Sequence, residues 1–318
     1  MLHAKINYTD LTASKLVLGT DTFGTLVDET ECFRMLDRFT EADGNMIDTA
    51  SIYADWLGMG KSISEKTIGK WLTTRGCRNK MIISTKGGHH DLNTLTSRLA
   101  LASVREDFQA SLANLQTDYI DIYWLHKDDV KQTPESLIEM LNEAAPVEYA
   151  RYLGVSNWSY DRIKAANDHA KANGLRPVIA SQIQHSIAKL NQAAYGIVAM
   201  DADSYQQYQN NDLNVFAFSS QAKGFFAIME NSGLDGLPSR TRDMFLNDEN
   251  LALFDRLKAM SAQKGISIPM LVIAALVSDS AVNTFAQIGP RTLSELEISL
   301  QGADVQLTEQ ERILLLNS

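Results

Sequence analysis

The chain has 318 residues, of which 45% are hydrophobic and 21% are charged, and its formal net charge is −10. This composition supports a large core and argues against long disordered segments. The negative charge disfavours nucleic acid and anionic membranes as partners. The two cysteines, Cys32 and Cys77, form no disulfide framework, and no apolar run approaches membrane-spanning length. We therefore expect a complete, cytoplasmic protein.

Short apolar runs alternate with helical patterns along the whole chain. The runs are continuously apolar, which is typical of parallel strands buried on both faces. Eight strands are expected, at residues 16–20, 46–49, 81–86, 119–126, 152–156, 178–183, 214–219 and 282–289.

Helical patterns fill most of the intervals between these strands. Thr133-Pro134 is a good helix start, and Gly174 and Gly265 mark helix ends. The expected helices cover residues 29–41, 63–72, 99–115, 134–144, 159–173, 203–211 and 251–264, with a further one that begins at Pro269.

This alternation predicts an α/β protein with a parallel sheet, and eight units predict closure into a (β/α)8 TIM barrel formed by one domain, residues 1–318. An open doubly wound sheet is the alternative. Residues 223–250 are rich in turn-forming residues and are expected to form a long loop. It follows a strand, so it would lie at the end of the barrel where active sites are built.

Several polar residues stand at the ends of predicted strands. Asp48, Lys86 and His126 each end one, and Tyr53 follows Asp48 closely. Strand ends are often polar because they meet solvent, so no single residue is diagnostic. In a barrel, however, these side chains converge at one mouth and form an acid–base set.

These residue types suit the reduction of a carbonyl. Hydride addition places negative charge on the carbonyl oxygen, which must then be protonated. A tyrosine with its ordinary pKa of about 10 is a weak acid at neutral pH, and a nearby lysine cation is expected to lower that pKa. Asp48 supplies the counter-ion that a buried lysine needs. A neutral histidine can orient the carbonyl oxygen through a hydrogen bond.

Six segments together resemble the aldo-keto reductase family, in order and over essentially the whole chain. They read NMIDTASIYAD, IISTKGG, DYIDIYWLHKDD, YLGVSNW, ASQIQ and IGPRTLSELEISL. The resemblance implies an NAD(P)H-dependent oxidoreductase that reduces a carbonyl or oxidises the matching alcohol. Tyr53 would be the proton donor, Lys86 would tune it, Asp48 would anchor Lys86, and His126 would orient the substrate.

The resemblance also assigns residues to a nicotinamide cofactor. One group would hold the carboxamide, an aromatic ring would stack on the nicotinamide, and other residues would contact the phosphates and the adenosine. The cofactor-binding residues implied are Thr20, Ser156, Asn157, Gln182, Phe218, Ser219, Gly289, Arg291, Thr292, Glu295 and Ser299.

Glu295 and Ser299 depart from the family pattern and bear on the choice of cofactor. The carboxylate of Glu295 would repel a 2′-phosphate, and Ser299 stands where an asparagine usually contacts the adenine. Arg291, in contrast, suits a 2′-phosphate. NADP(H) is expected, with NAD(H) as the alternative.

Trp56, His89 and His185 are predicted to line the substrate pocket. Such side chains can stack on sugar faces or bind hydroxyls, so a sugar, keto-sugar or glycoside is one hypothesis. A simple aldehyde is the other. Little chain follows the last motif, so we expect an open pocket. No metal site is expected, because the adjacent His89 and His90 point in different directions.

A second class of function stays open. Some members of the family hold the cofactor as regulatory or sensor subunits with little turnover. Retention of cofactor without its consumption would distinguish this class from an enzyme. Whether the chain is a monomer or a homo-oligomer is not predicted.

Overall fold

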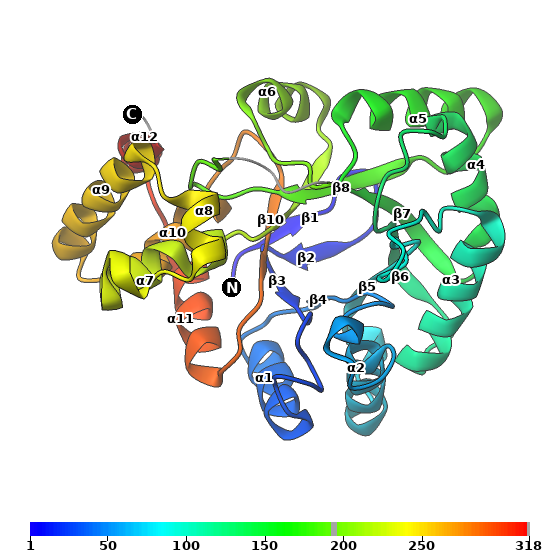
Figure 1. The fold of residues 1–318 in the computed structure, drawn as a ribbon, viewed down its shortest axis with the longest axis horizontal. Helices are drawn as coiled ribbons and strands as arrows, with labels where there is room; N and C mark the ends of the chain where they lie inside the picture. Colours follow the sequence, from blue (N-terminus) through cyan, green and yellow to red (C-terminus); the bar gives the residue numbers. More distant parts are fainter. Residues whose placement is uncertain (192–195, 317–318) are drawn as a thin grey trace.

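The computed structural model describes residues 1–191 and 196–316. Eight parallel strands close into a barrel in the order β10-β3-β4-β5-β6-β7-β8-β9, with helices around it (Figure 1). The predicted (β/α)8 barrel and its eight strands are confirmed. The barrel strands are β3 (Leu16–Gly19), β4 (Met46–Asp48), β5 (Ile82–Gly87), β6 (Ile120–Leu125), β7 (Ala150–Ser156), β8 (Val178–Gln184), β9 (Asn214–Phe218) and β10 (Thr284–Ile288).

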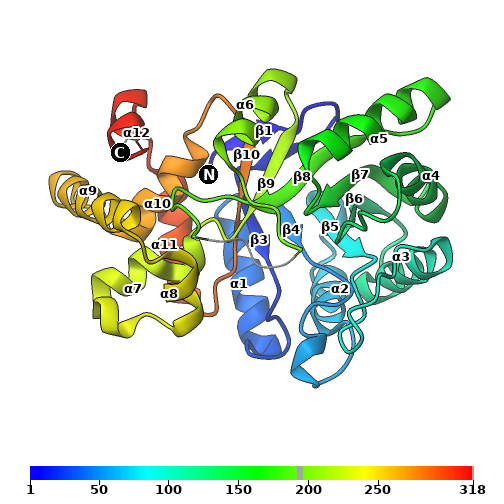
Figure 2. The ribbon, with the colours of Figure 1, turned by 45° about the horizontal axis from the view of Figure 1, so that its top comes forward.

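The helices form the outer layer, as the two views in Figures 1 and 2 show. Two predicted helices match to the residue because their caps are local: Asp28 accepts from the Glu31 N–H, and Thr133 accepts from the Ser136 N–H. The helices are α1 (Glu29–Glu41), α2 (Ile63–Arg75), α3 (Leu101–Leu115), α4 (Pro134–Ala144), α5 (Tyr160–Asn173), α6 (Ala202–Asn211), α7 (Phe225–Ser232), α8 (Ser239–Phe245), α9 (Asp248–Lys264), α10 (Ile268–Val277), α11 (Leu293–Asp304) and α12 (Glu309–Leu316).

The expected long loop at residues 223–250 is wrong. It contains α7 and α8, with a short 3-10 turn at Leu234–Gly236 between them. Phe225 and Phe245 are fully buried in a core cluster with residues of α9 and α10. Tertiary packing of these aromatic rings therefore outweighs the glycines and the proline that suggested a loop.

A hairpin that the sequence patterns did not indicate covers the N-terminal end of the barrel. Its strands are β1 (His3–Lys5) and β2 (Thr12–Ser14), paired antiparallel. The Asn45 amide holds this hairpin at the start of β4, accepting from the Ser14 N–H (2.8 Å) and donating to the Thr12 carbonyl (2.9 Å). The barrel end is closed in this way.

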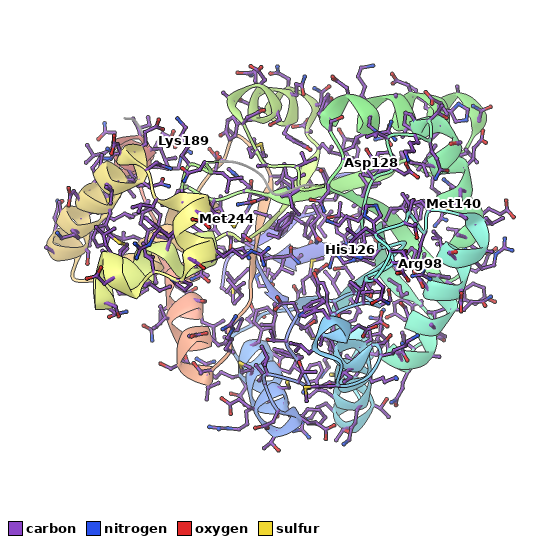
Figure 3. All side chains as sticks on the ribbon, in the orientation of Figure 1. Arg98, His126, Asp128, Met140, Lys189 and Met244 are labelled. Atoms are coloured by element: carbon purple, nitrogen blue, oxygen red, sulfur yellow. The ribbon has the colours of Figure 1, made fainter. Side chains whose placement is uncertain are left out.

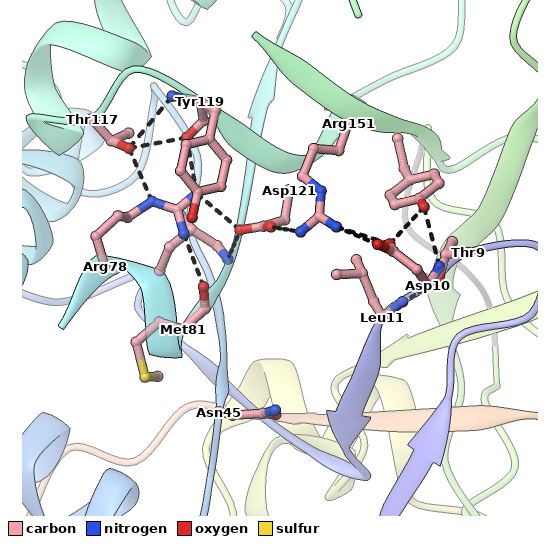
Figure 4. Close-up of polar contacts among 12 residues, drawn as sticks. Thr9, Asp10, Leu11, Asn45, Arg78, Met81, Thr117, Tyr119, Asp121 and Arg151 are labelled. Carbon is pink, nitrogen blue, oxygen red and sulfur yellow. Dashed lines mark hydrogen bonds and ion pairs between the residues drawn. The ribbon is translucent and has the colours of Figure 1, made fainter. Parts of the chain in front are cut away.

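An ion-pair network reinforces the same end (Figure 4). Asp121, at the start of β6, is 2% exposed and accepts hydrogen bonds from Arg78 (2.9 Å), from Arg151 (2.8 Å) and from the Ile83 N–H (2.9 Å). Arg151 also pairs with Asp10 of the hairpin (2.8 Å). Every charge of the network has a partner, which is the condition under which burying such groups is tolerated.

The barrel interior is filled by large side chains, Trp124 among them. Trp124 is fully buried, lies in register with Lys86 on the next strand, and packs edge-on against Phe216. Gly154 makes room for it, because a Cβ there would lie 2.1 Å from the indole ring. The interior is thus a packed core, and ligands are confined to its mouth.

Within the described residues, no single helix has both the length and the apolar character to cross a membrane. Taken together, α9 and α10 have the length and the apolar composition of a membrane span, but the two helices are bent by 100° relative to each other.

Candidate active site

The C-terminal ends of β4, β5 and β6 bring four predicted residues together. Asp48 and Lys86 are fully buried. The Lys86 Nζ donates to the Asp48 carboxylate, to the Thr49 carbonyl (2.6 Å) and to the Tyr53 hydroxyl (3.0 Å). These bonds use all three donors of an ammonium group, so the direction of Lys86 is fixed.

Side chains from two further strands, β8 and β10, donate hydrogen bonds to Asp48. Besides Lys86 and the Ser84 hydroxyl (2.6 Å), the amides of Gln182 (3.2 Å) and Gln287 donate to it. The Gln287 Oε1 is buried and has no partner. Sequence reasoning missed Gln287, and the available signal was a lone amide within an apolar strand.

The Tyr53 hydroxyl stays protonated in this environment. Burial, followed by the charges of Asp48 and Asp21, holds the pKa of Tyr53 well above its usual range. The expected lowering of this pKa by Lys86 is therefore not seen, because burial and the charges of Asp48 and Asp21 raise it. At neutral pH Tyr53 is therefore a phenol, the form that can donate a proton.

His126 stands beside Tyr53, near the centre of the view in Figure 3. Its ring meets the Tyr53 ring edge-on, with 5.8 Å between centroids. Burial, and then the charge of Lys86, lower the pKa of His126 well below its usual range, so the imidazole is neutral. The Nδ1 atom is buried without a partner, which leaves Nε2 as the nitrogen that can meet a ligand.

Two of the three predicted substrate residues lie with this group. Trp56 is 49% exposed, and its ring is 6.2 Å from the Tyr53 ring, edge-on. The His89 ring is 4.8 Å from the His126 ring. His185 lines a different cavity of about 350 Å³, together with Tyr205 and other residues of the helix layer, and none of the four residues above lines that cavity.

The residues predicted to bind the carboxamide lie on adjacent strands at the same mouth. The Ser156 hydroxyl donates to the Gln182 carbonyl (3.0 Å), and the Asn157 amide donates to the Ser156 oxygen (3.0 Å). Asn157 has a φ of 62°. The buried Thr20 hydroxyl donates to the Asp48 carbonyl (3.0 Å), so Thr20 supports the backbone next to the site.

The turn after Phe218 has an unusual backbone. Ser219, Ala222 and Lys223 have φ values of 52°, 50° and 53°, and Gly224 follows at 78°. Left-handed residues turn backbone N–H groups into concave anion sites. Sequence reasoning missed Lys223. Burial, and then the charges of Arg240 and Arg291, lower the pKa of Lys223, and the charge of Asp21 opposes them.

The predicted adenosine residues gather after Gly289, at the start of α11. Thr292 caps this helix by accepting from the Glu295 N–H (3.2 Å), and the Glu295 carboxylate accepts from the Arg291 N–H (2.8 Å). Ser299 is buried, and its hydroxyl donates to the Glu295 carbonyl (3.0 Å). Glu295 is therefore turned toward its own helix N-terminus.

Comparison with known proteins identifies the class. Residues 15–313 match the model of the aldo/keto reductase family. Norsolorinic acid reductase stcV of Emericella nidulans is 27% identical over 313 residues, which cover 94% of this chain and 76% of the relative. Aryl-alcohol dehydrogenase [NADP(+)] of Phanerodontia chrysosporium is 32% identical over 163 residues, 48% of this chain and 41% of the relative.

A solved structure matches at the level of the fold. It is a thermostable aldo-keto reductase in complex with the inhibitor epalrestat, with a TM-score of 0.73 and 20% identity, and the match covers 99% of this chain and 98% of the other. Fold and relatives define an NAD(P)-dependent oxidoreductase. The chain belongs to the aldo/keto reductase family.

Proposed function

We propose that the chain reduces a carbonyl to an alcohol with NADPH, or catalyses the reverse, at the mouth formed by Asp48, Tyr53, Lys86 and His126. One observation carries the proposal. A buried lysine contacts both a carboxylate and the hydroxyl of a protonated tyrosine, beside a neutral histidine.

Each of these residues has a distinct task. The His126 Nε2–H donates to the carbonyl oxygen and orients it. The Tyr53 O–H bond breaks as its proton passes to that oxygen. The phenolate left behind is stabilised by the Lys86 ammonium 3.0 Å away until solvent returns a proton. The nicotinamide, when bound, supplies the hydride that goes to the carbonyl carbon.

The residues around the mouth fit a nicotinamide dinucleotide. The unpartnered Gln287 Oε1 is a buried acceptor, and Gln287 shares Asp48 with Gln182, one of the residues assigned to the carboxamide together with Ser156 and Asn157. Phe218 is assigned to stack on the ring. The turn 219–224, with left-handed Ser219, Ala222, Lys223 and Gly224, would contact the pyrophosphate through the Lys223 side chain and the N–H groups that do not bond within the turn.

NADPH is favoured over NADH by the charges at the adenosine end. Arg291 is exposed there, and Lys223 and Arg240 add positive charge nearby. The repulsive carboxylate of Glu295 is already hydrogen-bonded to the Arg291 N–H, which reduces its negative field.

The proposed substrate is a sugar, keto-sugar or related polyhydroxylated carbonyl. The half-exposed Trp56 ring provides a stacking surface beside Tyr53, and His89 adds a polar group. An aryl alcohol is the second candidate, favoured by the names of three relatives.

Cytoplasmic location is part of the proposal. Both cysteines, buried Cys32 and partly buried Cys77, are free thiols, which fits a reducing compartment.

The first test is a titration of tryptophan fluorescence with NADPH and with NADH. We expect tight binding of NADPH and weaker binding of NADH. Arg291→Ala is expected to weaken NADPH alone, and Glu295→Gln to tighten it, while both variants leave NADH affinity nearly unchanged. Binding of neither cofactor contradicts the proposal.

Turnover completes the test. NADPH oxidation that depends on an added polyol carbonyl supports the enzyme, and turnover of aryl aldehydes alone would assign the second substrate class. Tight NADPH binding without turnover of any carbonyl would instead indicate a regulatory subunit.

A further inference from the structure

His89 is held in a fixed place by the turn that follows β5. Gly88 adopts a φ of +71°, and its N–H donates to the buried Asp107 carboxylate (2.9 Å). Asp107 is in turn paired with Arg98 (2.7 Å), which Figure 3 labels between His126 and α3. A Cβ at Gly87 would lie 2.1 Å from the Tyr123 hydroxyl. The two glycines allow a sharp turn that places His89 against His126.

The backbone determines which nitrogen of His89 carries its proton. The Nδ1 atom lies 2.8 Å from the His90 carbonyl oxygen, which can only accept a hydrogen bond. Nδ1 is therefore protonated. Burial lowers the pKa of His89, so the ring is neutral at physiological pH. The Nε2 atom is consequently a bare acceptor, and it has no hydrogen-bond partner among the described residues.

His126 has the opposite arrangement. Its buried Nδ1 lacks a partner, and an N–H without an acceptor is rarer in protein interiors than an unsatisfied acceptor. Nδ1 is therefore bare and Nε2 carries the proton. The two rings are 4.8 Å apart, edge to face. The mouth thus presents one donor, on His126, beside one acceptor, on His89.

We infer that His89 is a specificity-determining residue, whose Nε2 accepts a hydrogen bond from a hydroxyl on the carbon next to the reacting carbonyl. The inference rests on the proposed function, since His126 and Tyr53 must hold the carbonyl oxygen. It defines the substrate class as α-hydroxy carbonyl compounds and, in the reverse direction, vicinal diols.

The physical reason is the cost of an unpaired group. A substrate with a methyl group in place of the hydroxyl covers Nε2 and leaves it without a partner. Sites built to bind a hydroxyl discriminate strongly against an analogue that lacks it, because the buried polar group then goes unsatisfied.

Hydroxyacetone and butanone test this directly, because they differ only in a hydroxyl or methyl group next to the ketone. We expect the wild-type protein with NADPH to show a kcat/KM about tenfold or more higher for hydroxyacetone. His89→Phe keeps an aromatic ring but removes the acceptor, and it should lose that preference by lowering kcat/KM for hydroxyacetone alone. His90→Phe is the matched control, because the His90 carbonyl remains, and it should leave the preference intact.

Binding provides a readout independent of turnover. With NADP⁺ present, propane-1,2-diol should quench tryptophan fluorescence at lower concentration than butan-2-ol in the wild type, and the two should become equal in His89→Phe. If His89→Phe does not fold, the test is the wild-type protein alone: the dissociation constant of propane-1,2-diol should be lower than that of butan-2-ol, and equal constants would overturn the inference.

The outcomes separate this inference from the proposed function. Wild-type turnover of both ketones with equal kcat/KM overturns the role of His89 and leaves carbonyl reduction standing. Equal losses on both ketones in His89→Phe overturn it too. Turnover of neither ketone nor of any other carbonyl contradicts the proposed function itself.

Discussion

The two ends of the barrel differ in how their charged and polar side chains are paired. At the N-terminal end, Asp121, Arg78, Arg151 and Asp10 pair with one another and the hairpin covers them, although the buried Thr284 hydroxyl there has no partner. At the C-terminal end, buried acceptors such as the Gln287 Oε1 are left without a partner. Unsatisfied buried groups cost stability, so they are expected where a ligand completes them. The first end stabilises the fold, and the second is prepared for a ligand.

The backbone shows a related difference. At the N-terminal end, the left-handed residues Gln116 and Asp212 end helices, and the left-handed Tyr8 lies in the turn of the hairpin. At the mouth, Asn157, Ser219 and Lys223 are left-handed at positions that end no helix. A left-handed residue other than glycine costs roughly 1–2 kcal/mol. Strain of this kind tends to gather where function requires it.

Removing one tyrosine hydroxyl at each end of the barrel is expected to give the largest difference between the two ends. Tyr53→Phe at the mouth should lower turnover by about 10²–10⁴-fold, because the proton donor is lost. NADPH affinity, from fluorescence titration, should stay within error of the wild type. The melting temperature should change little.

Tyr152→Phe is the matched change at the other end, where the hydroxyl donates to Asp10 (2.7 Å). It should lower the melting temperature slightly and leave kcat unchanged. Loss of turnover in Tyr152→Phe, or full turnover in Tyr53→Phe, would contradict the division of roles between the two ends.

Asp121→Ala tests the N-terminal network as a whole. Removing the carboxylate leaves Arg78 and Arg151 without their buried partner, which should lower the free energy of unfolding by about 3–5 kcal/mol. Chemical denaturation measures this loss. Turnover per folded molecule should stay at the wild-type value, and a fall in kcat without a loss of stability would be the contrary result.

Gln287→Leu examines the link between the two glutamines and Asp48. The variant removes one donor from the carboxylate that orients Lys86, and losing a hydrogen bond to a charged group costs about 1.5 kcal/mol, or about tenfold in rate. We expect kcat to fall while KM for the carbonyl stays constant, in steady-state assays at saturating NADPH. An unchanged kcat would show that Gln287 does not position Asp48.

The pH dependence follows from the environments of Tyr53 and His126. The raised pKa of Tyr53 keeps the phenol protonated, and the lowered pKa of His126 keeps the imidazole neutral. Carbonyl reduction should therefore be nearly constant from about pH 6 to 9, whereas alcohol oxidation, which needs the phenolate, should rise throughout that range. A decline in reduction between pH 7 and 9 would show that Lys86 lowers the pKa of Tyr53 after all.

Sequence patterns predicted the barrel because apolar runs alternate with helical patterns along the whole chain. The same patterns missed β1 and β2, whose segments HAK and TAS are not apolar runs, and α7 and α8, whose packing partners lie elsewhere in the chain. Asp48, Lys86 and His126 were predictable because each stands at a strand end.

Side-chain direction was harder to predict than position along the chain. Successive side chains of a strand point to opposite faces. Gln182 reaches Asp48 inside the barrel, whereas Ser181 meets Tyr208 of α6 outside it. His185 shares the parity of Ser181, which accounts for its place in the helix layer. The contact of Gln287 with Asp48 depends on barrel closure, which no local pattern encodes.

That closure has a consequence for how the chain folds. The seam joins β3, near the beginning of the chain, to β10, near its end, and Lys15 reaches the Thr284 carbonyl across a separation of 269 residues. During synthesis β3 is made early, but it cannot pair with β10 until the end of the chain is made. Contacts so distant in sequence form slowly. Until β10 is made, the sheet has two open edges, at β3 and at the last strand formed, and this is the stage at which the nascent protein is most exposed to aggregation.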